Sequence, residues 1–221
     1  MKLSYVVWIV FLSVLLVLIL PYLYQIGSII FFSNNVSILR QLEIYKWLGV
    51  GIAIYSILHH FSKKNIIWCE TFSHEMTHII IALIFRKRIH SFRADEGSGA
   101  ILTSGHNSID DLPISLAPYC LPIFTYLLLS LRCLLNDNMV WGYDIILGAS
   151  ICFHFFCFKN QIGNYQTDIN QYPLILSYLY ILTALIINIC IIAVAFFPQY
   201  NVYTSTWRLF KAVYSNFIYL L

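Results

Sequence analysis

Charged residues are scarce in this chain. Asp, Glu, Lys and Arg make up 10% of its 221 residues, whereas a soluble domain averages about 25%. Hydrophobic residues make up 60%, and the net charge is only +3. Such a small charge does not indicate a nucleic-acid-binding protein. We therefore expect an integral membrane protein that contacts the lipid bilayer and has no nucleic-acid partner.

Other features that the sequence lacks narrow the class of membrane protein further. No polar segment is long enough to form a soluble regulatory domain, and no internal repeat is visible. The chain contains six cysteines but no Cys-x-x-Cys spacing, and most of them lie in apolar segments. We therefore predict that the cysteines are small packing residues, and not disulfide partners or zinc ligands.

Long apolar runs dominate the sequence. A membrane-spanning helix needs about 20 apolar residues. The runs of this length are Leu3–Tyr24, Ile66–Phe85, Pro113–Leu135, Val140–Phe158 and Leu174–Phe197. A further run, Trp47–Phe61, is shorter and predicts a short, tilted or re-entrant segment. The expected fold is an all-α transmembrane helix bundle of five or six spans, the first of which is a retained signal anchor.

Two polar or mixed segments complete the predicted organisation. Within Arg86–Leu112, the stretches Ile89–Ala94 and Ala100–Ser104 flank a glycine-containing turn and predict a small β-hairpin. After Pro198, aromatic residues at helical spacing predict an interfacial amphipathic tail. We divide the chain into an anchor helix with the short segment (residues 1–65), a membrane core (residues 66–197) and the tail (residues 198–221).

The most informative motif is His74-Glu75-Met76-Thr77-His78, inside an apolar run. On a helix the two histidines lie one turn apart on one face, where they can share a zinc ion. Glu75 is placed to accept a proton from a water molecule activated by the metal. The alternative is a pair of buried core histidines. Ionisable groups at membrane depth cost about 2.5–3.5 kcal/mol each, which favours a functional metal site.

A catalytic zinc usually has three protein ligands, so a third is needed. The only glutamate after the motif is Glu96, which lies in the predicted turn. Asp168, shortly before the last apolar run, is the preferred candidate. Its alternative role is a helix cap for that run. His154, in an apolar helix, is the next candidate.

These residues resemble the site-two-protease-type intramembrane zinc metalloproteases, in their compact peptidase-like branch without a PDZ domain. In that family an H-E-x-x-H helix supplies two zinc ligands and the base, and a later aspartate supplies the third. His74, Glu75 and His78 match the first element, and Asp168 in Gln166-Thr167-Asp168 is similar to the second. The family also has a membrane-associated β-hairpin after the catalytic helix, as expected here for residues 86–112.

The motif and the resemblance together predict a zinc-dependent intramembrane endopeptidase with one Zn²⁺ per chain, bound by His74, His78 and Asp168. Its substrates would be transmembrane or membrane-proximal segments of membrane proteins. Glu75 would be the catalytic base, and Asn160, Asn164 or His154 would hydrogen-bond the oxyanion or a metal ligand. The alternative is a non-proteolytic metal-binding membrane protein, either a transporter or an inactive adaptor. The sequence leaves the substrate's identity and the oligomeric state open.

The basic residues predict an orientation. Arg86, Lys87, Arg88 and Arg93 form the densest basic cluster. By the positive-inside rule, residues 86–112 are cytoplasmic. We expect the protein in the bacterial inner (plasma) membrane. The N-terminus is on the same side if Trp47–Phe61 does not fully cross, and on the opposite side if it does.

Overall fold

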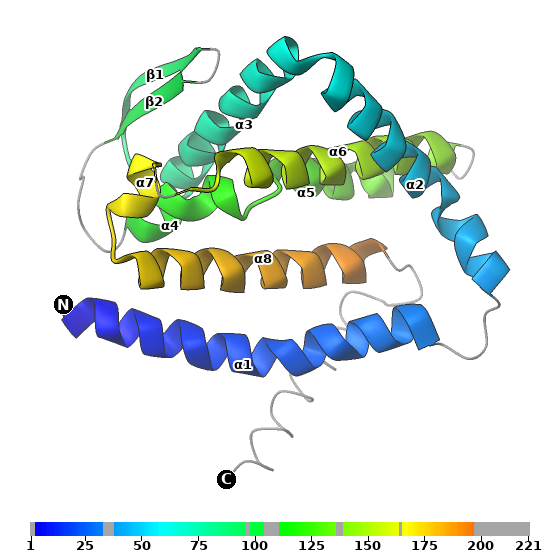
Figure 1. The fold of residues 1–221 in the computed structure, drawn as a ribbon, viewed down its shortest axis with the longest axis horizontal. Coiled ribbons are helices and arrows are strands. Elements are labelled where there is room, and N and C mark those ends of the chain that lie inside the picture. The colour runs from blue at the N-terminus through cyan, green and yellow to red at the C-terminus, as the bar shows by residue number, and fades with distance from the viewer. Residues whose placement is uncertain are drawn as a thin grey trace, which may run out of the picture.

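A computed structural model describes residues 3–32, 38–95, 98–103, 111–135, 139–163 and 165–196 of the protein (Figure 1). The predicted tail at 198–221 lies outside these residues. The described chain is predominantly helical, with one two-stranded sheet, as the sequence predicts. Its long helices are α1 (Leu3–Phe32), α2 (Ile38–Phe61), α3 (Lys63–Ile84), α6 (Val140–Gln161) and α8 (Leu174–Phe196).

Three of these helices are long and apolar enough to cross a membrane. The qualifying segments are Leu3–Leu20, Val140–Gln161 and Leu174–Ala193. Large apolar side chains on α1, such as Val7 and Val14, are more than half exposed in the isolated chain. A lipid environment suits such a surface, because hydrocarbon tails would cover it.

The predicted span Pro113–Leu135 is broken. It forms α4 (Leu112–Leu116), the 3₁₀ turn η2 (Ala117–Tyr119), α5 (Ile123–Leu131) and the 3₁₀ turn η3 (Arg132–Leu134). The two halves meet at an angle of 80° around the break at residues 120–122. Pro122 has no N–H to continue the helix, and its ring would collide with the carbonyl one turn earlier. The pair counts as a fourth candidate span if it crosses as one unit.

The remaining two helices, α2 and α3, do not meet the same criterion. The predicted count of five or six spans is therefore not reached by length and composition alone. In α3 the cause is the candidate site itself, since Glu70, His74, Glu75 and His78 interrupt the apolar run. The two helices meet at Ser62 and form a V (Figure 1).

Helix α2 packs closely along α6, and the two run in the same direction. The rings of Trp47 and Trp141 lie 5.9 Å apart near their beginnings, and His59 stacks on Phe156 at 3.9 Å near the end of α2. At Gly148 the approach is so tight that an added Cβ would overlap the backbone of α2. Small residues allow such close helix contacts in membranes.

The predicted hairpin is present. Strand β1 (Ile89–Asp95) pairs antiparallel with β2 (Ser98–Thr103), with an irregularity between Ile89 and Ser91. It lies against α3, where the rings of Phe72 and Phe92 are 6.2 Å apart.

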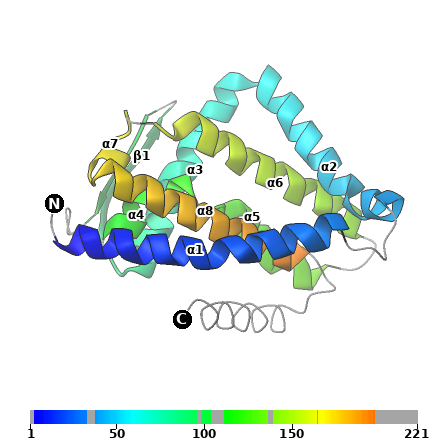
Figure 2. The same cartoon turned by 60° about the horizontal axis from the view of Figure 1, so that its bottom comes forward.

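A buried core joins α1 to the segments around α4 and the short helix α7 (Thr167–Asn170). Its members are Leu12, Leu112, Leu116, Tyr119, Ile169, Tyr172, Leu176 and Ile181. Helices α1 and α8 run in the same direction (Figure 1), and near their beginnings Tyr5 lies edge-on to Tyr172 at 6.5 Å. The beginning of α1, the hairpin, α4 and α7 therefore lie at one end of the molecule, which we call the site end (Figure 2).

Candidate metal centre

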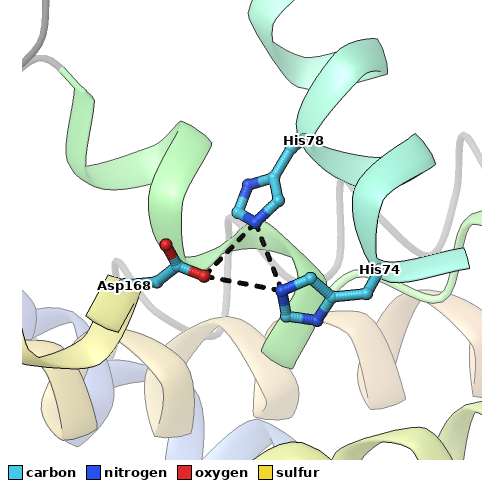
Figure 3. Close-up of side chains that lie close together, drawn as sticks. All are labelled: His74, His78 and Asp168. Atoms are coloured by element: carbon cyan, nitrogen blue, oxygen red, sulfur yellow. Dashed lines mark hydrogen bonds and ion pairs between the residues drawn. The ribbon is translucent and has the colours of Figure 1, made fainter. Parts of the chain in front are cut away.

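The two motif histidines and Asp168 converge at the site end (Figure 3). His74 and His78 lie one turn apart on α3, and each is only 8% exposed. Asp168 comes from the first turn of α7. The two Nε2 atoms are 3.2 Å apart, and Asp168 Oδ2 lies 3.5 Å from His74 Nε2 and 3.4 Å from His78 Nε2. Within the described residues, no other such group of potential metal ligands is found.

These distances fit one tetrahedral metal ion. Two ligands bonded to zinc at 2.0–2.1 Å in tetrahedral geometry are about 3.3–3.4 Å from each other. The three separations of 3.2, 3.4 and 3.5 Å lie close to that value. The residues present therefore suit a zinc ion with three protein ligands and one open position.

Hydrogen bonds from the far side of each ring orient both histidines. His78 Nδ1 is 2.8 Å from the Ile114 carbonyl, which can only accept, so Nδ1 carries the proton. His74 Nδ1 donates in the same way to Gln161 Oε1 at 2.9 Å. Both Nε2 atoms then present lone pairs toward each other and toward a carboxylate. Three acceptors facing one point favour a cation there.

Asp168 is held by a buried tyrosine. The Tyr119 hydroxyl donates to Asp168 Oδ2 at 3.3 Å, and its ring lies edge-on to His74 at 5.1 Å. Burial alone would raise the pKa of Asp168, but when His74 and His78 are protonated at Nε2, their hydrogen bonds and positive charge outweigh burial and hold that pKa well below its usual range. Asp168 caps neither the last apolar helix α8, which begins only at Leu174, nor α7, whose N-cap position is Gln166. Its carboxylate faces the histidines instead.

Comparisons with protein-family models, curated proteins and solved structures gave no match.

Glu75 is buried beneath the hairpin. It is 7% exposed, and Gly99 of β2 packs directly on its side chain. A Cβ at position 99 would overlap the Glu75 carboxylate group. A side chain there would have to displace either the hairpin or Glu75. An isolated glycine in a strand often marks such a close approach, so the sequence contains a signal for this contact.

The other predicted site residues do not join the cluster. Asn160 donates from Nδ2 to both carboxylate oxygens of Glu70, each at 3.1 Å, and the oxyanion role predicted for it gains no support. His154 lies on α6 with a buried Nε2 that has no hydrogen-bond partner in the described part of the protein. Asn164 lies outside the described residues. Sequence reasoning missed Gln161, Tyr119 and the Ile114 carbonyl, which are joined to the site only by the fold.

Proposed function

We propose that this protein is a zinc-dependent intramembrane endopeptidase of the site-two-protease type. The observation that carries the proposal is the convergence of His74, His78 and Asp168 at zinc-ligand spacing beside a buried Glu75. Structural zinc sites are usually closed by four Cys or His ligands. Three ligands with an adjacent carboxylate suit a hydrolytic site better.

In this proposal each site residue has a separate role in peptide hydrolysis. His74, His78 and Asp168 would hold zinc, which when bound would polarise the scissile carbonyl and acidify water. Glu75 would accept a proton from the attacking water and pass it to the leaving amine. Gln161 and Tyr119 would keep His74 and Asp168 in position through their hydrogen bonds.

The arrangement of the helices supports five crossings. We propose that α1, α6 and α8 each cross once, that the bent α4–α5 pair crosses once, and that α2 and α3 together make one angled crossing. This count places the beginning of α1 and the hairpin on the same side, in agreement with the Tyr5–Tyr172 contact. The metal centre then lies near one membrane boundary, since Gln161 ends α6 and Asp168 precedes α8.

A substrate helix must unwind before attack, because its peptide bonds are hidden in intrahelical hydrogen bonds. The hairpin could bind the unwound segment of the substrate as an additional strand. Among the described residues the sheet has two strands, which leaves the outer edge of each strand unpaired there, and an extended peptide can add to such an edge. Strand β2 passes directly over Glu75, so a peptide bound along the hairpin would lie near the base.

The basic cluster sets the proposed orientation. Arg86, Lys87, Arg88 and Arg93 lie at the site end, which we assign to the cytoplasm. In a variant lacking the native cysteines, a cysteine replacing Ser98 should react with an impermeant thiol reagent only from the cytoplasmic side of inner-membrane vesicles. Inverted and right-side-out vesicles provide the two arms. Labelling only in right-side-out vesicles would show that the hairpin faces the opposite side of the membrane, which contradicts the proposed orientation.

Cleavage of a single-span peptide reconstituted with the purified protein tests the proposed activity. Zinc binding without cleavage in any member of a varied peptide panel would favour the alternative, a transporter or an inactive adaptor. The Glu75→Gln variant separates these functions, because a transporter has no need of a base beside the metal.

A further inference from the structure

A second buried polar cluster lies one helical turn before His74. Its centre is Glu70 of α3, which is only 4% exposed. Asn160 of α6 donates to both carboxylate oxygens at 3.1 Å, and His59 Nε2 of α2 is 3.3 Å from Oε1. A buried carboxylate is costly unless it is paired, and here two other helices supply the partners. Through these contacts the cluster connects α2, α3 and α6 at the position of Glu70.

The cluster is directly connected to the metal centre through α6. Asn160, bound to Glu70, is followed by Gln161, the last residue of α6, whose Oε1 accepts from His74 Nδ1 at 2.9 Å. Glu70 and His74 lie one turn apart on α3. Two consecutive residues of α6 therefore bind two residues on one face of α3. The end of a helix is otherwise free to fray, so a fixed Asn160 restricts where Gln161 can lie.

We propose that Glu70 is a positioning residue for the metal centre. By holding Asn160, it fixes the end of α6 so that Gln161 accepts the Nδ1 proton of His74. That bond keeps the Nε2 lone pair of His74 directed toward His78 and Asp168. The inference rests on the proposed metal centre, but not on peptide cleavage. Outer partners of this kind change metal affinity about 10–100-fold when they are removed.

The Glu70→Gln substitution tests the inference because it preserves size but changes the hydrogen bonding. Glutamine has one acceptor oxygen and a donor NH₂ group, so it cannot accept from Asn160 with both ends. We expect Co²⁺ to bind the purified full-length variant about 10–100-fold more weakly than the wild type. The visible absorption spectrum of bound Co²⁺ should also change, since it reports ligand geometry.

A double-mutant cycle distinguishes positioning from general stabilisation. If Glu70 acts through Gln161, the Glu70→Gln and Gln161→Ala double variant should bind Co²⁺ no more weakly than Gln161→Ala alone. Thr71→Val is the matched control, because among the described residues the Thr71 hydroxyl donates to the Ile67 carbonyl of its own helix and to no group of either cluster. Its Co²⁺ affinity should equal that of the wild type. If Glu70→Gln does not fold, Asn160→Ala removes the same contact and carries the same expectation.

The Co²⁺-binding results test the role of Glu70 separately from the proposed peptidase activity. Unchanged Co²⁺ affinity in Glu70→Gln, or losses that add in the double variant, would overturn the role of Glu70. A wild-type protein that binds no Co²⁺ would overturn both the metal centre and this inference. Normal Co²⁺ binding without peptide cleavage would count against the peptidase proposal alone, and the affinity changes would still decide the role of Glu70.

Discussion

Replacement of Glu75 by glutamine is expected to lower peptide cleavage by about 10²–10⁴-fold while zinc remains bound. Glutamine keeps the shape of the side chain and can fill the same space beneath Gly99, but it cannot accept the proton from water. The histidines and Asp168 are untouched by the change. Mass spectrometry of a reconstituted single-span peptide measures cleavage, and elemental analysis of the purified protein measures zinc.

Glu43→Gln is the matched control for this experiment. It removes one negative charge from α2, at a position 31 residues before His74 in the sequence. Its cleavage rate and zinc content should equal those of the wild type. Loss of zinc in Glu75→Gln would make Glu75 a metal ligand or a structural residue. Cleavage at the wild-type rate with zinc bound would show that another group is the base.

Replacement of Asp168 by alanine is expected to remove most of the bound zinc and, with it, the activity. The change deletes one of the three proposed ligands and removes the carboxylate that accepts from the Tyr119 hydroxyl. Loss of a helix cap alone would cost only about 0.5–2 kcal/mol of stability and would leave zinc in place. The bundle should stay folded, because helix packing and the bilayer do not depend on this carboxylate.

Asp144→Asn is the control for this second experiment. Asp144 is a buried acid on α6 whose carboxylate lies 3.6 Å from Arg132, outside the metal cluster. Its removal can affect stability but should leave zinc at one ion per chain. Full zinc occupancy and activity in Asp168→Ala would refute the ligand assignment. His154 would then be the next residue to replace.

Local patterns predicted the elements of this fold well. The apolar runs indicated the long helices, and turn residues between β-prone stretches indicated the hairpin. The missing N–H of proline accounts for the bend near Pro122, although Pro113–Leu135 was expected to form one span. The number of crossings did not follow, because the polar residues of α3 keep its apolar character below that expected of a membrane span. The position of α3 depends on its packing against the hairpin and the turn η2 as well as against α6.

The candidate site was predictable only where residues are close in sequence. The spacing of His74 and His78 places them on one helical face whatever the rest of the chain does. Asp168 was reached by elimination among acidic residues, and the structure brings it to the histidines. Gln161 and Tyr119 lie far along the chain from the histidine or carboxylate they contact. No periodicity encodes such pairs, because they arise only when α6, η2 and α7 assemble around α3.

X-ray absorption at the zinc edge of the purified full-length protein tests the central claim most directly. The proposal predicts about one zinc per chain, bonded to two imidazole nitrogens and to oxygen at about 2.0–2.2 Å, with no sulfur ligand. The imidazole signal should be lost together with the metal in a His74→Ala variant. A sulfur ligand at about 2.3 Å, or zinc that persists unchanged without His74, would contradict a centre built from His74, His78 and Asp168.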